Sequence, residues 1–215
     1  MKNLLYKEFR LVVSPLYFLT VLFGALLLIP QWPYFIAMLY LFFFIVPNVF
    51  ANAKAINDTG FTMMLPIRKR DAVKARVISV AALELAQVVT AVPFAFLNMS
   101  VYPRGNMLID ANLAYLGCVF MMYGIFNVIF FPMFYKTAYM LGWPLALSIA
   151  GATLFAFAVE ALTAAVPAVN HALDGISGGA LIRQLPVLGA GMLCYALLTA
   201  LAYRKSAANF EKVDL

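Results

Sequence analysis

Two polar side chains, Glu84 and Gln87, stand one helical turn apart inside a long apolar run. Glu84 lies seven residues after Val77, where that run begins, which predicts a depth near one membrane leaflet. A carboxylate is costly at such a depth unless it is neutral, paired or facing a polar cavity, so residues of this kind often mark a substrate path. A hydrogen bond between two helices is the alternative interpretation. We expect one of these two roles, with Lys54 as a candidate partner of Glu84.

A basic segment over residues 54–76 is the second candidate site. It holds six of the fifteen cations, Lys54, Arg68, Lys69, Arg70, Lys74 and Arg76. Pro66 is predicted to begin a short helix, since its fixed φ suits a first turn and its missing N–H costs nothing there. Most residues of 67–75 are good helix formers. Such a helix would present charge to a soluble partner; alternatively, the segment is an ordinary basic loop that only sets membrane topology.

Several chemistries have no matching motif in the sequence. A G-x-x-x-x-G-K-[ST] phosphate loop is absent, so the chain is not expected to hydrolyse ATP by itself. The single histidine, His171, cannot build a two-histidine metal site. No nucleophile elbow occurs in the apolar runs. We therefore predict no catalytic residue, no metal site and no cofactor within this chain.

The composition identifies the solvent of the fold. Of the 215 residues, 65% are hydrophobic and only 11% are charged, whereas ordinary globular domains carry about 25% charged residues. A water-soluble fold cannot bury so much apolar surface, so the lipid bilayer must surround it. The cations flank apolar runs instead of gathering on one water-facing surface, which argues against nucleic-acid binding. Residues 1–215 are predicted to form a single all-α, polytopic transmembrane domain.

Hydrophobic periodicity and length predict an interfacial helix and six membrane spans. Residues 1–13 place apolar side chains on one helical face and Lys2, Lys7 and Arg10 on another, which is typical of a helix lying on the membrane surface. Apolar runs of about 20 residues suffice to cross a hydrocarbon core of about 30 Å. The predicted spans are residues 15–29, 34–53, 77–99, 113–135, 143–166 and 185–203, with an external loop at 167–184.

The distribution of cations predicts the orientation. With both termini in the cytoplasm, thirteen of the fifteen cations are cytoplasmic and only Arg104 and Arg183 are external. Lys and Arg near membrane helix ends resist translocation, so this orientation is strongly favoured over its inverse. An even number of spans agrees with basic residues at both ends of the chain. We expect a multi-pass protein of the cell membrane.

The basic segment also carries a family resemblance. The residues Leu65-Pro66-Ile67-Arg68-Lys69, followed by Asp71, match a Leu-Pro-x-x-[Arg/Lys] turn with a nearby acidic residue. With the six spans and the Lys7-Glu8 start, the chain resembles the compact permease subunits of ABC type-two exporters, in particular those that export peptides and antimicrobial peptides. The resemblance implies that residues 1–13 form an elbow helix and that residues 167–184 form short external helices. It also implies that the chain couples to an ATPase through Pro66, Ile67, Arg68, Lys69, Arg70, Asp71 and Lys74.

The resemblance further implies a mechanism. A separate ABC ATP-binding subunit, which carries ATP and Mg²⁺, would dock on residues 66–74. A second permease chain, identical or different, would complete a dimer that moves an amphipathic peptide or a lipid-like substrate out of the cell. Two alternatives remain open. One is an integral membrane enzyme acting on lipid or peptide, and the other is a membrane immunity or signalling protein without transport activity.

Overall fold

A computed structural model describes residues 2–13, 21–102, 108–137, 140–175 and 177–213. Five helices in this part of the chain are long and apolar enough to cross a membrane: Phe35–Ala55, Lys69–Val101, Leu113–Thr137, Gly142–Ala165 and Gly178–Glu211. The prediction of an all-α, multi-pass protein is confirmed. The predicted first span, residues 15–29, lies partly outside the described residues, so six spans are not confirmed. Its described part, η2 (Val21–Leu28), is a 3-10 helix.

The helices follow one another in the order predicted. The short N-terminal helix, predicted over residues 1–13, consists of α1 (Lys2–Lys7) and the π-helical turn η1 (Glu8–Val12). The helix Phe35–Ala55 combines three consecutive pieces. The bounds of all elements that follow η2 are α3 (Phe35–Tyr40), η3 (Leu41–Ile45), α4 (Val46–Ala55), α5 (Asp58–Met64), α6 (Lys69–Val101), α7 (Leu113–Thr137), α8 (Gly142–Ala165), α9 (Pro167–Leu173) and α10 (Gly178–Glu211).

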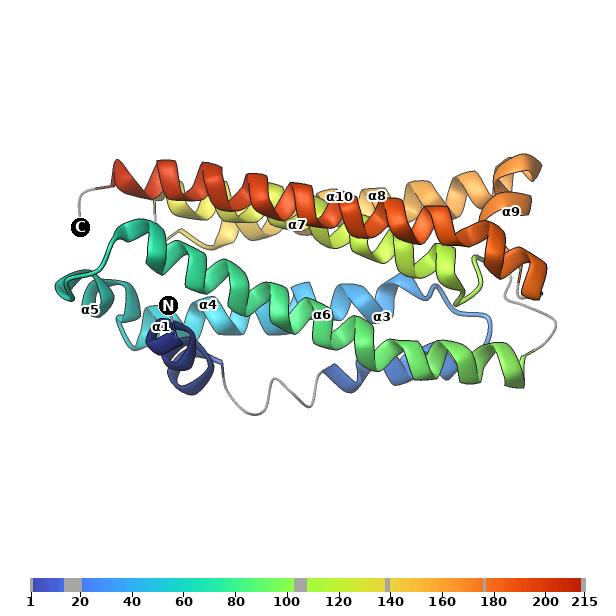
Figure 1. Cartoon of the computed structure of the whole chain (residues 1–215), viewed down its shortest axis with the longest axis horizontal. Helices are drawn as coiled ribbons and strands as arrows, with labels where there is room; N and C mark the ends of the chain where they lie inside the picture. The colour runs from blue at the N-terminus through green and yellow to red at the C-terminus, as the bar shows by residue number, and fades with distance from the viewer. Residues whose placement is uncertain (1, 14–20, 103–107, 138–139, 176, 214–215) are drawn as a thin grey trace.

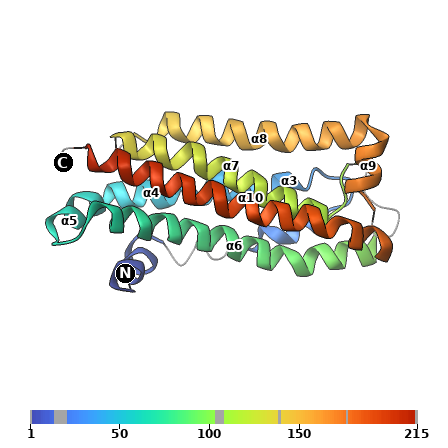
Figure 2. The same ribbon diagram turned by 45° about the horizontal axis from the view of Figure 1, so that its top comes forward.

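The long helices form two layers that lie against each other (Figure 1). One layer holds α7, α8 and α10, and the other holds α6 with the helix formed by α3, η3 and α4. Figure 2 shows α10 between α7 and α6, so α10 belongs to the first layer and borders the second. Side chains that reach from α6 to α7 or α10 therefore join the two layers.

Glycines allow the closest contacts between helices. A Cβ atom added to Gly191 on α10 would lie 2.1 Å from the carbonyl oxygen of Gly117 on α7, so only glycine fits at this crossing. Gly24 on η2 likewise approaches the backbone of Ala91 on α6. Gly191 makes such a contact, whereas a Cβ at Gly189 would meet nothing within 4 Å.

The basic segments meet at one end of the bundle. The helix α1, the turn around α5 and the C-terminal end of α10 lie together, while α9 lies at the opposite end (Figure 1). At the α9 end, Asn112 and Gln184 donate side-chain hydrogen bonds to the carbonyl oxygens of Leu173 and Gly175. These bonds close the loop before α10, within the region predicted as external.

The short helix of the basic segment lies earlier than predicted. This short helix is α5, which ends before Pro66. The prediction that a helix begins at Pro66 is wrong. Leu65 adopts an extended conformation with ψ of 150°, as proline requires of the residue before it, and this ends α5. The next helix begins only at Lys69 and continues without a break to Val101. Residues 69–76 are therefore the first turns of α6 and not a separate helix.

Candidate functional site: a charge cluster and a buried polar junction

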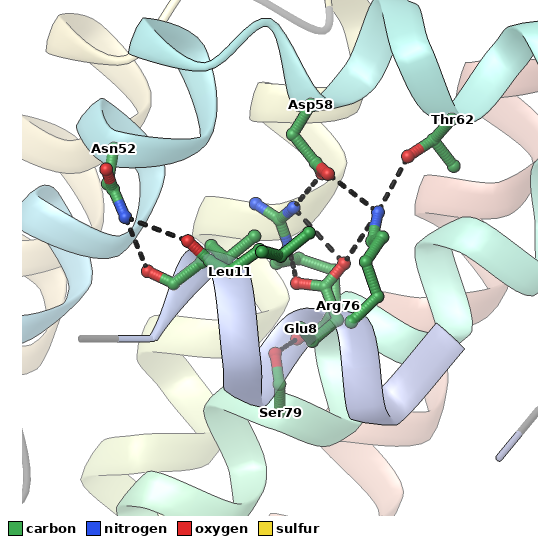
Figure 3. A network of polar contacts seen from close by, with 9 residues as sticks. Glu8, Leu11, Asn52, Asp58, Thr62, Arg76 and Ser79 are labelled. Atoms are coloured by element: carbon green, nitrogen blue, oxygen red, sulfur yellow. Dashed lines mark hydrogen bonds and ion pairs between the residues drawn. The ribbon is translucent and has the colours of Figure 1, made fainter. Parts of the chain in front are cut away.

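Four charged side chains meet at the α5 end of the bundle, and we call Lys7, Glu8, Asp58 and Arg76 the charge cluster (Figure 3). The Nε atom of Arg76 lies 2.5 Å from a carboxylate oxygen of Glu8, and its Nη2 atom donates to Asp58 at 2.7 Å. The Nζ atom of Lys7 lies 2.8 Å from Asp58 and 3.4 Å from Glu8. Two cations thus face two anions.

The charge cluster is almost completely removed from solvent. Glu8, Asp58 and Arg76 are 2%, 5% and 6% exposed. The guanidinium of Arg76 also lies over the ring of Phe50 on α4, 5.4 Å from its centroid. Burying an isolated charge would cost many kcal/mol, so each of these ions depends on the others. The cluster therefore fastens η1, α4, α5 and α6 into one unit.

Local backbone features place Asp58 and the N-terminal helix at the cluster. Asn57 adopts the left-handed conformation, φ 50° and ψ 38°, which asparagine tolerates better than most residues. This residue turns the chain from α4 into α5 and puts Asp58 in the first turn of α5, next to Arg76. On α4, the side-chain amide of Asn52 donates to the carbonyl oxygens of Leu11 and Val12 and thereby holds the end of η1 (Figure 3).

The residues predicted to couple to an ATPase fall into three groups. Pro66, Ile67 and Asp71 line an open groove between α1 and the α5–α6 turn, together with Lys2, Asn3, Leu4, Lys7, Phe61 and Leu65. Arg68 and Lys74 are exposed, and neither has a partner within the part of the chain that the structure describes. The structure thus leaves two of the predicted cations open at this end.

Lys69 and Arg70 form the third group, and they contact the end of the chain. Arg70 donates to both carboxylate oxygens of Glu211, at 2.5 and 3.0 Å. Lys69 donates to the carbonyl oxygen of Val213 at 2.6 Å and lies over the ring of Phe210. These two cations hold the C-terminal end of α10 against the first turn of α6. Their role in coupling stays a prediction.

Glu84 lies in the middle of the bundle and joins the two layers. Its Oε2 atom accepts hydrogen bonds from the hydroxyl of Tyr195 on α10, at 2.7 Å, and from the amide of Asn127 on α7, at 3.0 Å. The same amide donates to Thr199 on α10 at 3.2 Å. The prediction that Lys54 is the partner of Glu84 is wrong. Lys54 is exposed near the end of α4, and the hydrogen bonds of Glu84 go to α7 and α10. We call Glu84, Asn127, Tyr195 and Thr199 the Glu84 junction.

Gln87 makes a second bridge one turn further along α6. Its amide nitrogen donates to the carbonyl oxygen of Ala37 on α3, and its carbonyl oxygen accepts from the hydroxyl of Tyr123 on α7. Glu84 and Gln87 are both 0% exposed. Their contacts are hydrogen bonds between helices, which was the alternative interpretation of this pair. That the pair lines a substrate path at another stage stays a prediction.

Sequence reasoning missed most of the charge cluster. Arg76 was assigned to the basic surface, and Glu8 and Asp58 received no role. One signal was present: the chain has only nine acidic residues, and Glu8 stands in a helix that otherwise carries cations. Within the described residues, no group of three or more His, Cys, Asp or Glu side chains is placed to hold a metal ion. The cluster is thus an arrangement of ion pairs.

Comparison with known proteins places this architecture in a family. No curated protein and no solved structure matches the chain. A family model described as ABC-2 family transporter protein matches residues 3–205, which is most of the chain and includes both the charge cluster and the Glu84 junction. Permeases of this family work with an ATP-binding subunit. The chain belongs to the ABC-2 family of transporter proteins and is a membrane permease component.

Proposed function

We propose that the chain is the permease of an exporter whose separate ATPase subunit docks at the α5 end and moves α6. Family membership supports the pairing with an ATP-binding subunit. The observation that carries the proposal is the continuity of α6. This single helix of 33 residues begins in the exposed basic turn, passes the charge cluster at Arg76 and reaches the Glu84 junction.

The length of α6 suits a lever. At 1.5 Å per residue, its 33 residues measure about 50 Å, whereas the hydrocarbon core of a membrane is about 30 Å thick. Several turns of α6 thus project beyond the membrane at the end that carries Arg68 and Lys74. A push on these turns is transmitted to the Glu84 junction, because a hydrogen-bonded helix moves as a rigid body. Because the charge cluster joins the N-terminal helix and α5 to α6, these two helices move together with α6.

The docking surface that we propose combines the groove and the two open cations. Pro66, Ile67 and Asp71 contribute to the groove, and Arg68 and Lys74 supply positive charge beside it. A protein segment with an acidic rim and apolar side chains fits this surface. ATP and Mg²⁺ bind on the partner subunit. This end of the bundle is then cytoplasmic, which agrees with the strong preference of Lys and Arg for that side.

The remaining parts of the proposal rest on the family resemblance and the composition. Residues 15–29 form a sixth span, so that both termini are cytoplasmic. Two permease chains, identical or different, enclose the path. The cargo is an amphipathic peptide or a lipid-like molecule, for which the large apolar faces of α8 and α10 would provide a suitable lateral surface. An integral membrane enzyme would need polar groups that converge on one site, and it is disfavoured because the available residues Glu84, Gln87 and Glu160 are all buried.

Charge reversal tests the docking surface. The chain is co-expressed with a candidate ABC ATP-binding subunit, sought among the neighbouring genes, and co-purification and ATPase activity are measured for the wild type and for Arg68→Glu/Lys74→Glu. We expect the double variant to insert normally and to lose most of the bound ATPase. Arg183→Glu is the matched control, since Arg183 is an exposed cation near the start of α10, at the opposite end of the bundle. Unchanged co-purification of the double variant would contradict the proposed surface.

A further inference from the structure

The Glu84 junction contains two buried oxygen atoms that lack a hydrogen-bond donor among the described residues, Oε1 of Glu84 and Oδ1 of Asn127. Both belong to side chains that are already joined, since Nδ2 of Asn127 donates to Oε2 of Glu84 at 3.0 Å. Buried polar atoms are nearly always paired in proteins, so two unpaired acceptors in one contact call for a physical explanation.

The junction also lacks a positive charge. Its neighbours with titratable groups are Tyr195 on α10 and Tyr123 on α7, and each donates its hydroxyl proton, to Glu84 and to Gln87 respectively. The ion pairs of the described residues do not include Glu84, and Arg76 on the same helix is already paired with Glu8 and Asp58. An ionised carboxylate in this place would be a buried charge without compensation, which apolar surroundings strongly disfavour.

The existing bonds determine where a proton would sit. Oε2 of Glu84 already accepts two hydrogen bonds, from Tyr195 and Asn127, so both of its lone pairs are occupied. The added proton therefore belongs on Oε1. Once protonated, Oε1 is a hydrogen-bond donor. The amide group that donates to Oε2 also carries Oδ1 of Asn127, the second unpaired acceptor. One added proton would then supply the donor that both unpaired atoms lack, and would make the contact a reciprocal pair between a carboxylic acid and an amide.

We propose that Glu84 is a proton-binding site, whose neutral acid form pairs reciprocally with Asn127 and fastens α6 to α7 and α10. The proton is held only while the two layers are closed around it. When the layers part and water reaches Glu84, the carboxyl group can ionise, and the ionised form resists closing again. Proton binding and the packing of α6 are thus linked, whatever the cargo of the permease and whether or not an ATPase moves α6.

Infrared spectroscopy tests the protonation directly. The purified chain in lipid nanodiscs at neutral pH is expected to show the carbonyl band of a protonated carboxyl group, and the band should lose one component in Glu84→Gln. Glu160→Gln is the matched control, because Glu160 is also a buried carboxyl, 9% exposed, but lies on α8 away from the junction. The control should keep the component that Glu84→Gln removes. If Glu84→Gln leaves this band unchanged, Glu84 is ionised and the proposal is overturned.

Thermal unfolding supplies an independent test. The amide of Glu84→Gln can donate to Oδ1 of Asn127 where the acid did, so its melting temperature should stay close to that of the wild type. Glu84→Ala removes every hydrogen bond of the side chain and should lower the melting temperature by roughly 4 °C or more. If Glu84 were an ionised carboxylate, its charge would strengthen these hydrogen bonds, and Glu84→Gln would then lower the melting temperature markedly. If Glu84→Gln unfolds as early as Glu84→Ala, the neutral acid pair is excluded.

Discussion

The charge cluster and the Glu84 junction are both buried polar sites on α6, separated by about 12 Å along the helix, but they solve the problem of burial differently. In the charge cluster, Lys7 and Arg76 face Glu8 and Asp58, so that the charges balance. In the Glu84 junction, the partners are a tyrosine, an asparagine and a threonine, all uncharged.

The difference follows from depth in the membrane. Near the end of the bundle, cations and anions can meet because segments rich in charge leave the membrane there. In the middle of the bundle, a chain with 11% charged residues offers Glu84 no counter-ion, and neutral hydrogen-bonding groups take its place. Removing any one ion from the first site should destabilise the protein. The second site should tolerate an uncharged replacement of the same shape. Substitutions can separate these two behaviours.

Removal of Arg76 is expected to have the largest effect. Arg76→Ala leaves Glu8 and Asp58 buried with only Lys7 to balance them, and breaking a buried ion pair by removing one partner costs about 3–5 kcal/mol. The free energy of unfolding in detergent should fall by this amount, or the protein should fail to accumulate. Arg70→Ala is the control, because its pair with Glu211 is largely exposed and should change stability little. Equal stability of the two variants would mean that the cluster does not hold the fold.

The same glutamate-to-glutamine exchange at the two sites gives the sharpest comparison. Glu8→Gln removes an anion that accepts one hydrogen bond from Arg76 and forms an ion pair with it, and it should lower the free energy of unfolding by about 2 kcal/mol. Glu84→Gln should leave it nearly unchanged, for the reason given above. Chemical denaturation of both variants in the same detergent measures the two effects. If the two losses are alike, the sites do not differ in charge state.

Contact between α7 and α10 underlies the Glu84 junction, because these two helices carry three of its side chains. Gly191→Ala would place a methyl group against the backbone of Gly117 and should destabilise the protein by about 1–3 kcal/mol. A shift of α10 would also pull Tyr195 away from Glu84. Gly189→Ala, on an open face of the same helix, should have little effect. Thermal unfolding of the pair tests whether the crossing requires glycine at residue 191 alone.

The smallest expected effect concerns the C-terminal contact. Glu211→Gln should leave stability unchanged within measurement, since the pair with Arg70 is exposed to solvent. It removes the carboxylate that occupies Arg70 and should slightly strengthen binding of an acidic ATPase segment. Co-purification of the ATPase at rising salt concentrations would detect this gain. A clear loss of binding would instead assign Glu211 to the docking surface.

Much of the fold could be predicted from local sequence patterns. All five long helices lie over predicted spans, because apolar runs of membrane length have few alternatives to a helix in lipid. Three of them agree with the predicted bounds to within two residues, whereas α6 begins eight residues before the span 77–99 and α10 extends seven and eight residues beyond the span 185–203. The helix boundaries beyond these spans could not be predicted in the same way. Pro66 was expected to begin a helix, yet its effect on Leu65 ends one, and α6 begins three residues later at Lys69. Both effects of proline are local, and the sequence pattern did not distinguish between them.

For the candidate sites, too, some residues could be selected from the sequence, whereas their partners could not. Glu84 and Gln87 could be selected from the sequence, because polar residues inside an apolar run are costly and therefore have partners. Their partners could not be named, since Asn127 and Tyr195 lie on two later helices whose rotation depends on close contacts such as that of Gly117 with Gly191. Lys54 was predicted because it lies at the inner end of the preceding span and has the opposite charge, and both reasons were insufficient.

The sequence by itself determined that this chain is a helical membrane protein with its cations gathered at the ends of its helices, because charged side chains are excluded from lipid and apolar runs of this length are driven into it. Only the tertiary structure decided which charges neutralise one another. Glu8 and Arg76 are 68 positions apart and meet through the turn at Asn57 and the packing of η1 on α4 and α6. Electrostatic attraction acts through space, so the pairs that form depend on where the folded backbone brings the side chains together.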